Sequence, residues 1–138
     1  MKYIDEKFVK KSIIKWLGRK GYSRSLRHGE LSEHGVDIKV RHNNYPRYFL
    51  IECKGDPNPD TFGSVNSGRE VAFNYVLGQI VSRMRSKSKY WYAIGLPDSM
   101  REKIIKRLPK EVCKKLRLKI LLVSENGKVE ELNWRHLK

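Results

Sequence analysis

The chain has 138 residues, of which 39% are hydrophobic, so it is long and apolar enough for one domain to bury its own core. It contains no run of about 18 apolar residues, and residues 1–6 turn acidic where a secretory signal would turn apolar. The two cysteines, Cys53 and Cys113, stand outside any Cys-x-x-Cys or Cys/His cluster, which argues against a structural zinc site and a disulfide scaffold. We therefore expect a single domain over residues 1–138, in the cytoplasm and without a membrane partner.

An excess of basic residues is the strongest bulk signal. The 30 Lys and Arg residues outnumber the 15 Asp and Glu residues, giving a formal net charge of +15. A positive field of this size attracts polyanions and speeds their encounter with the protein. An anionic membrane surface would call for a basic amphipathic helix, but here the basic residues are spread over the whole chain. Nucleic acid is therefore favoured over a membrane surface or mere solubility, although charge does not distinguish DNA from RNA.

The first part of the chain predicts a helix and a hairpin. Apolar residues recur every three or four positions over residues 3–20, and Gly18 and Gly21 end this helix. Residues 22–27 fit a short strand. An alternating strand, a turn and a second, antiparallel strand are then expected at residues 36–41, 42–46 and 47–54.

The second part predicts alternating helices and strands. After an irregular loop over residues 56–68, Ser67 and Glu70 resemble a capping box that opens a helix reaching about Arg85. Its expected buried stripe consists of Ala72, Phe73, Val76, Leu77, Ile80 and Met84. The later elements are a strand over 90–96, a helix that starts at 97–99 and is interrupted by Pro109, a strand over 118–123, and a hairpin through Asn126-Gly127 into 129–132. This order predicts an α/β fold, with a central mixed β-sheet flanked by helices.

The strand over residues 47–54 changes character toward its end. Side chains alternate between the two faces of a strand, and one of these faces is apolar throughout. The other face changes from Leu50 to the acid Glu52 and the base Lys54. Asp37 occupies the corresponding face of the preceding strand. A tight hairpin would therefore hold Asp37 and Glu52 side by side.

These polar residues point to metal-dependent chemistry. Two adjacent carboxylates repel each other unless a divalent cation lies between them. We expect Asp37 and Glu52 to bind a metal ion, with the backbone carbonyl of Cys53 as a further ligand. Lys54 would project beside the metal, where its charge orients attacking water and offsets charge that develops on a phosphate. Together with the basic surface, these groups predict hydrolysis of phosphodiester bonds.

The same residues carry a family resemblance. His34-Gly35-Val36-Asp37-Ile38 is followed by Glu52-Cys53-Lys54-Gly55, with fourteen residues between Asp37 and Glu52. This pattern resembles the PD-(D/E)xK nuclease superfamily, which includes restriction endonucleases and archaeal Holliday junction resolvases. The likeness spans residues 3–96 and extends to Gln79, because many members have a glutamine on the following helix. Val36 stands where the motif's name has proline, a position that varies in the superfamily.

The resemblance implies a restriction endonuclease-like fold and a DNA endonuclease dependent on Mg²⁺ or Mn²⁺, with Asp37, Glu52 and Lys54 as catalytic residues. The compact size favours a structure-selective, junction resolvase-like enzyme acting on duplex or branched DNA, with a restriction or homing-type enzyme as a close alternative. A homodimer is expected, because one domain of this size reaches only one strand. The competing class is a catalytically inactive, basic nucleic-acid-binding module with the same fold.

Two further residues are candidates for the catalytic site. Glu6 lies on the apolar stripe of the first helix and, as the resemblance implies, would reach the site as an added metal or water ligand. Alternatively, Asp5 and Glu6 simply favour the positive N-terminus of the helix. Gln79 would orient Lys54 or the nucleophile, or contact the substrate; the alternative is a polar residue at the boundary of the core.

Other polar residues have plain alternative explanations. His28 and His34 would suit a general base or a phosphate contact, but exposed loop histidines are commoner. Glu70 is accounted for by helix capping. Basic residues on and after the long helix would either follow a nucleic-acid backbone or form a solvated face; they are Arg69, Arg83, Arg85, Lys87 and Lys89. The loop over 56–68 would fold over substrate or only connect two elements.

Overall fold

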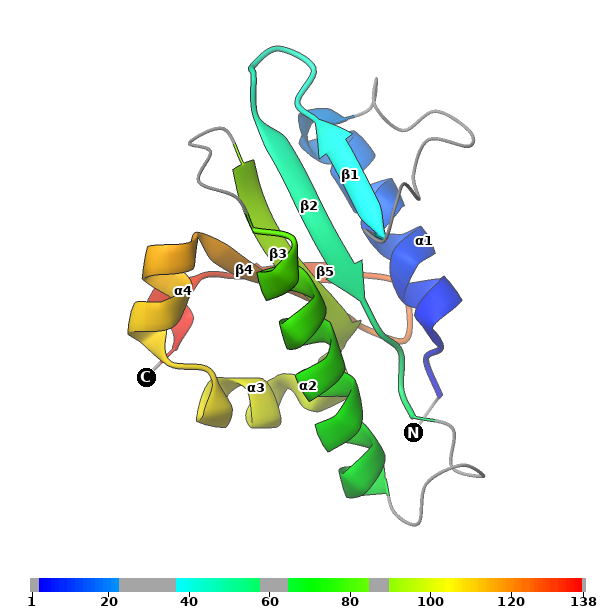
Figure 1. Cartoon of the computed structure of the whole chain (residues 1–138). Coiled ribbons are helices and arrows are strands. Elements are labelled where there is room, and N and C mark those ends of the chain that lie inside the picture. Colours follow the sequence, from blue (N-terminus) through cyan, green and yellow to red (C-terminus); the bar gives the residue numbers. More distant parts are fainter. Residues whose placement is uncertain (1–2, 23–36, 58–64, 85–89, 138) are drawn as a thin grey trace.

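The computed structural model describes residues 3–22, 37–57, 65–84 and 90–137. It is an α/β structure in which helices lie on both faces of a five-stranded mixed sheet (Figure 1). The strands are β1 (Ile38–Arg41), β2 (Tyr48–Cys53), β3 (Tyr90–Pro97), β4 (Leu118–Val123) and β5 (Val129–Leu132). The helices are α1 (Glu6–Leu17), α2 (Val65–Ser82), α3 (Arg101–Arg107) and α4 (Lys110–Leu116).

The spatial order of the strands follows their order along the chain. The outer pairs, β1–β2 and β4–β5, are antiparallel, whereas β2, β3 and β4 run parallel to one another. The predicted hairpin between β1 and β2 is confirmed, with Ile38 paired to Ile51. The predicted turn at Asn126-Gly127 also joins two antiparallel strands, and Gly127 adopts the positive φ of +85° that this turn requires.

Two hydrophobic cores lie on opposite faces of the sheet. Phe49, Ile51 and Cys53 pack with α1 on one face, whereas Leu50 packs with α2 on the other. Figure 1 shows α1 on one side of β1 and β2, and α2 with α3 and α4 on the other side. Alternate side chains of β2 therefore pack into different cores, as the alternation in its sequence predicts. Glu52 follows Leu50 by two residues and faces α2.

The first helix is shorter than predicted. Asp5 caps it, because its side chain accepts the backbone N–H of Phe8 at 2.8 Å, so α1 begins at Glu6 rather than at residue 3. The α-helix ends at Leu17. A π-helical turn over Gly18–Tyr22 follows it directly, and Gly21 within that turn has φ +96°. Tyr22 belongs to this turn rather than to the predicted strand over 22–27. The other residues of that segment lie outside the described ones.

The predicted capping box of α2 is wrong. The helix begins at Val65, so Ser67 lies within its first turn rather than at its N-cap. Glu70 instead pairs with Lys103 at 2.8 Å and with Arg107, which ties α2 to α3. The buried stripe itself is confirmed: Ala72, Phe73, Val76 and Ile80 are buried, and Leu77 and Met84 pack against the same core.

The C-terminal helices follow the sequence signals only in part. As predicted, Pro109 separates α3 from α4. Ser99 does not cap a helix; it lies within a 3₁₀ turn, Asp98–Met100, and its hydroxyl donates to Asp56 at 2.9 Å. Within the described ranges, no helix is long and apolar enough to cross a membrane.

Candidate active site

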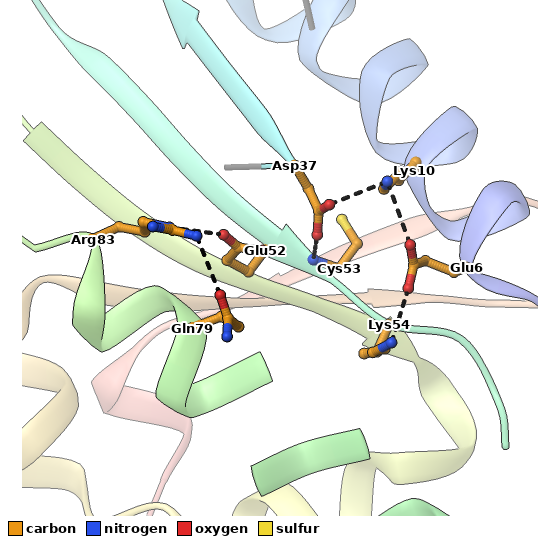
Figure 2. A network of polar contacts seen from close by, with 8 residues as sticks. All are labelled: Glu6, Lys10, Asp37, Glu52, Cys53, Lys54, Gln79 and Arg83. Atoms are coloured by element: carbon orange, nitrogen blue, oxygen red, sulfur yellow. Dashed lines mark hydrogen bonds and ion pairs between the residues drawn. The ribbon is translucent and has the colours of Figure 1, made fainter. Parts of the chain in front are cut away.

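The end of the β1–β2 hairpin brings Asp37 and Glu52 together. Asp37 immediately precedes β1, and continuing the register of Ile38 with Ile51 places Asp37 opposite Glu52. The two carboxyl groups are close enough for Asp37 to raise the pKa of Glu52. Figure 2 shows Asp37 and Glu52 at this end of the hairpin, with their dashed contacts directed to different partners.

The end of a strand pairing explains how Asp37 is held. Because β1 pairs with β2 only as far as Ile38, the N–H of Cys53 lies beyond the paired residues and donates to Asp37 Oδ2 at 2.8 Å. The other carboxylate oxygen of Asp37 lies 3.1 Å from Lys10 Nζ on α1. Burial alone would lower the pKa of Lys10, but the hydrogen bonds and charges of Asp37 and Glu6 together outweigh burial and raise that pKa. Asp37 is thus fixed from two sides.

Glu52 is a buried carboxyl group in an apolar strand. Its residue is 4% exposed. Burial, and next the neighbouring carboxylate of Asp37, raise its pKa to about 7, although the charge of Arg83 acts in the opposite direction. Arg83 Nε lies 3.6 Å from Glu52 Oε1, and this buried oxygen accepts no hydrogen bond from the protein. Glu52 is therefore held by an ion pair with Arg83 at a distance too long for a hydrogen bond.

Lys54 lies just past the end of β2, beside the acids. Its Nζ is 3.3 Å from Glu6 Oε1 and 4.5 Å from the centre of the Tyr75 ring. The Lys54 side chain is about one-third exposed, so a bound polyanion has access to it. These contacts with α1 and α2 orient the Lys54 side chain at the edge of the site.

Glu6 reaches the site because the chain after β2 passes directly over the start of α1. A Cβ atom on Gly55 would lie 2.2 Å from the backbone nitrogen of Glu6, so only glycine permits this approach. The carboxylate of Glu6 bridges Lys54 and Lys10, the latter at 3.4 Å from Oε2. Asp5 serves as the helix cap, which leaves Glu6 as the acid that faces the site.

Gln79 lies on α2 and contacts Arg83 rather than Lys54. Its side-chain oxygen accepts a hydrogen bond from Arg83 Nη2 at 3.2 Å. Arg83 in turn lies against Glu52, so Gln79 acts on the acid pair through Arg83 (Figure 2). Gln79 is a positioning residue in this arrangement.

Three residues at the site were not assigned these positions from the sequence. Lys10 lies four residues after Glu6 on α1, and Arg83 lies four residues after Gln79, just past the end of α2. This spacing is a signal for paired side chains. Asp56 joins separate segments: its carboxylate accepts the N–H of Ile4 at 3.0 Å and the hydroxyl of Ser99. A loop aspartate offers no such signal, because both partners are distant in sequence.

The available donors suit a hard divalent cation at two carboxylates. Among the described residues, no three Asp, Glu, His or Cys side chains form a group that could hold a metal ion. Asp37 and Glu52 remain as a pair, with a buried Glu52 oxygen that accepts no hydrogen bond. The N–H of Lys54 donates to the carbonyl of Gly95 on β3. Successive residues of a strand direct their N–H and C=O groups to opposite sides, so the N–H and the carbonyl of Cys53 point toward Asp37. The Cys53 carbonyl is therefore on the correct edge to serve as a third oxygen donor.

A pocket of about 300 Å³ adjoins this cluster and shares Lys54 and Glu6 with it. The other lining residues are Tyr3, Gly55, Asp56, Pro57, Gly68, Val71, Ala72 and Tyr75. Tyr3 and Tyr75 are 51% and 52% exposed, so much of each ring is open to a ligand.

Part of the predicted site lies outside the described residues, namely His28, His34, Arg85, Lys87, Lys89 and residues 58–64 of the loop. Arg83 is engaged with Glu52 and Gln79 and so is not simply a solvated cation.

Comparison with protein-family models, with curated proteins and with solved structures finds no match to this chain.

Proposed function

We propose that this protein is a metal-dependent DNA endonuclease with a restriction endonuclease-like fold, in which Asp37 and Glu52 bind Mg²⁺ or Mn²⁺. The observation that carries this proposal is the paired carboxylates at the end of the β1–β2 hairpin, one of them buried with its pKa raised to about 7. A buried carboxyl beside a second carboxylate destabilises a fold, and binding of a cation between them relieves the repulsion.

The donor set for the cation consists of Asp37, Glu52 and the backbone carbonyl of Cys53. When bound, a divalent cation polarises a phosphoryl oxygen and lowers the pKa of a coordinated water. The chain orients its own donors: the Cys53 N–H and Lys10 fix the carboxylate of Asp37. Arg83, held by Gln79, limits the excess negative charge at Glu52.

Lys54 stands two residues beyond Glu52 and supplies the positive charge on the substrate side. Its ammonium group offsets negative charge that develops on the phosphate during hydrolysis. Glu6 orients that ammonium group through the ion pair at 3.3 Å. The catalytic roles therefore divide into acids that bind the cation, a lysine that meets the phosphate, and Glu6 and Gln79 that position these groups.

The net charge of +15 supports a nucleic acid as the substrate. We assign DNA, duplex or branched, and a homodimer that presents one site to each strand. The direct test is incubation of the wild type with labelled duplex, single-stranded and four-way-junction DNA in Mg²⁺, with EDTA and a matching RNA as controls. Products that need Mg²⁺ support the assignment. Binding without cleavage removes the enzyme proposal, and cleavage of RNA alone removes the DNA substrate.

One observation favours a second candidate, a basic nucleic-acid-binding module without turnover. Each acid of the cluster contacts a cation of the chain itself: Lys10, Lys54 or Arg83. Such a network would persist without any metal. A Lys54→Met variant separates the two candidates, because the module predicts only weaker DNA binding, whereas the nuclease predicts loss of cleavage at saturating DNA.

A further inference from the structure

The pocket beside Lys54 has the size of a small-ligand site. Its volume of about 300 Å³ stands at the lower end of the range for pockets that hold small molecules, roughly 300 to 1,000 Å³. A duplex is far too large to enter it. A single base that has left its stack is a group of suitable size, and in that position it would remain joined to the strand beside Lys54.

The lining of the pocket suits a flat, neutral ring. Tyr3 and Tyr75 present exposed aromatic rings, and Val71, Ala72 and Pro57 add apolar surface. Every base has a π face, so stacking on an aromatic side chain binds unpaired nucleotides of any sequence. Tyr3 and Tyr75 line the same pocket, so their rings together offer a flat ligand an aromatic contact surface.

The charges around the pocket determine which part of a nucleotide enters. Glu6 and Asp56 line it, and their carboxylates disfavour a phosphate inside. Asp56 is already engaged by Ile4 and Ser99, and Glu6 by Lys54 and Lys10. Lys54 is the cation on the pocket wall, and ion pairs through Glu6 and Lys10 connect it to Asp37. The base therefore belongs in the pocket and its phosphate at Lys54.

We propose that this pocket binds one unstacked base of a DNA strand against Tyr75 and Tyr3, and thereby places the adjoining phosphodiester at the candidate active site. The inference rests on the proposed function in taking DNA as the ligand. It adds that unpaired nucleotides, at a branch, a flap or a single strand, are preferred over continuous duplex.

The test compares two DNA duplexes that share one strand with a single 2-aminopurine. In one duplex this base is paired with thymine, and in the other an abasic site opposite leaves it unpaired. Affinity is measured by fluorescence anisotropy in EDTA, so that no cleavage occurs. Tyr75→Ala is expected to weaken binding of the unpaired probe by about 5- to 150-fold and to leave the paired duplex within twofold. Tyr75→Phe keeps the ring and should keep the affinity.

Tyr45→Ala is the matched control, since Tyr45 is 57% exposed and lies in the β1–β2 turn, outside the pocket lining. The 2-aminopurine emission should change on binding to wild type and to the Tyr45 variant, but not to Tyr75→Ala. Equal effects of Tyr75→Ala and Tyr45→Ala, or no effect of either, overturn the base pocket. Free deoxynucleoside monophosphate that binds as tightly as the strand also overturns it, in favour of a mononucleotide site.

This experiment separates the base pocket from the nuclease. If wild type passes the binding test and never cleaves in Mg²⁺, the proposed function fails and the pocket stands. If Mg²⁺-dependent cleavage occurs and Tyr75→Ala still binds both probes like wild type, the nuclease stands and the pocket fails.

Discussion

The carboxyl group of Asp37 lies beside that of Glu52, and this proximity adds to burial in raising the pKa of Glu52 to about 7. The pair forms where β1 stops and β2 continues for two more residues. The backbone N–H of Cys53 is free of a strand partner there and fixes Asp37. One local feature, a strand end, thus creates both the acid pair and its anchor.

Replacement of Glu52 by Gln should change how stability depends on pH in metal-free protein. The pKa of this carboxyl is raised from 4.5 to about 7 in the fold, so the folded protein binds the proton more tightly than the unfolded chain. Its contribution to the free energy of unfolding is therefore fully present below pH 4.5. That contribution is lost as pH rises through 7. Between pH 5 and pH 8 the wild type should lose about 2 kcal/mol relative to Glu52→Gln, measured by urea unfolding in EDTA. Parallel pH profiles for the two proteins would show that Glu52 is not a buried, raised acid.

Binding of Mg²⁺ should stabilise the wild type and not the Glu52→Gln variant. A ligand that binds only the folded state at a hundred times its Kd adds about 2.7 kcal/mol to the free energy of unfolding, which raises the Tm by several degrees. Thermal unfolding with increasing Mg²⁺ at pH 8 measures this. The prediction fails if the Tm of wild type is unchanged, or if both proteins shift equally.

Replacement of Gly55 by Ala should destabilise the fold and disturb the site. The new Cβ would lie 2.2 Å from the backbone of Glu6, so the start of α1 has to move. A loss of about 1–3 kcal/mol is expected from such overpacking, with weaker positioning of Lys54 by Glu6.

Gly78→Ala is the control for that substitution. Gly78 lies in α2, and a Cβ there meets no atom within 4 Å, so alanine should stabilise by about 0.5–1 kcal/mol. Denaturant unfolding of the two variants should therefore give changes of opposite sign. Equal and small effects would contradict the close approach at Gly55.

Affinity for DNA should fall steeply with salt. Each phosphate neutralised by Lys or Arg releases bound counterions, so the logarithm of the binding constant falls linearly with the logarithm of salt concentration. About four phosphate contacts would reduce the binding constant roughly a hundredfold between about 50 and 200 mM salt. We therefore expect the measured binding constant to fall by at least about tenfold over this range. Fluorescence anisotropy with a labelled duplex measures the slope. A flat dependence would remove the role assigned to the basic surface.

The hairpin and the acid pair were predictable because they rest on local patterns. The alternation over 36–41 and 47–54 specified faces, and the short turn specified an antiparallel pairing that brings Asp37 opposite Glu52. The apolar stripe of α2 was predictable for the same reason. In each case the signal is the spacing of apolar residues within a single strand or helix, which can be read without knowing the rest of the fold.

Features that depend on contacts distant in sequence were not predictable. Glu70 follows Ser67 at the spacing of a capping box, yet it pairs with Lys103 and Arg107 on α3. The carboxylate of Asp56 accepts hydrogen bonds from Ile4 and Ser99, which lie 52 and 43 positions away in the sequence. The restriction endonuclease-like fold, the metal, the DNA substrate and the dimer stay predictions, because they concern partners that the chain alone does not display.

The central claim is most directly tested by the rate of Mg²⁺-dependent cleavage of four-way-junction DNA by wild type, Glu52→Gln and Glu125→Gln. Glu125 is an exposed acid in the β4–β5 turn and controls for loss of one negative charge. We predict cleavage by wild type and Glu125→Gln at similar rates, and a loss of at least about a hundredfold in Glu52→Gln. Cleavage by Glu52→Gln at the wild-type rate would contradict the site, and binding without cleavage by all three proteins would contradict the nuclease.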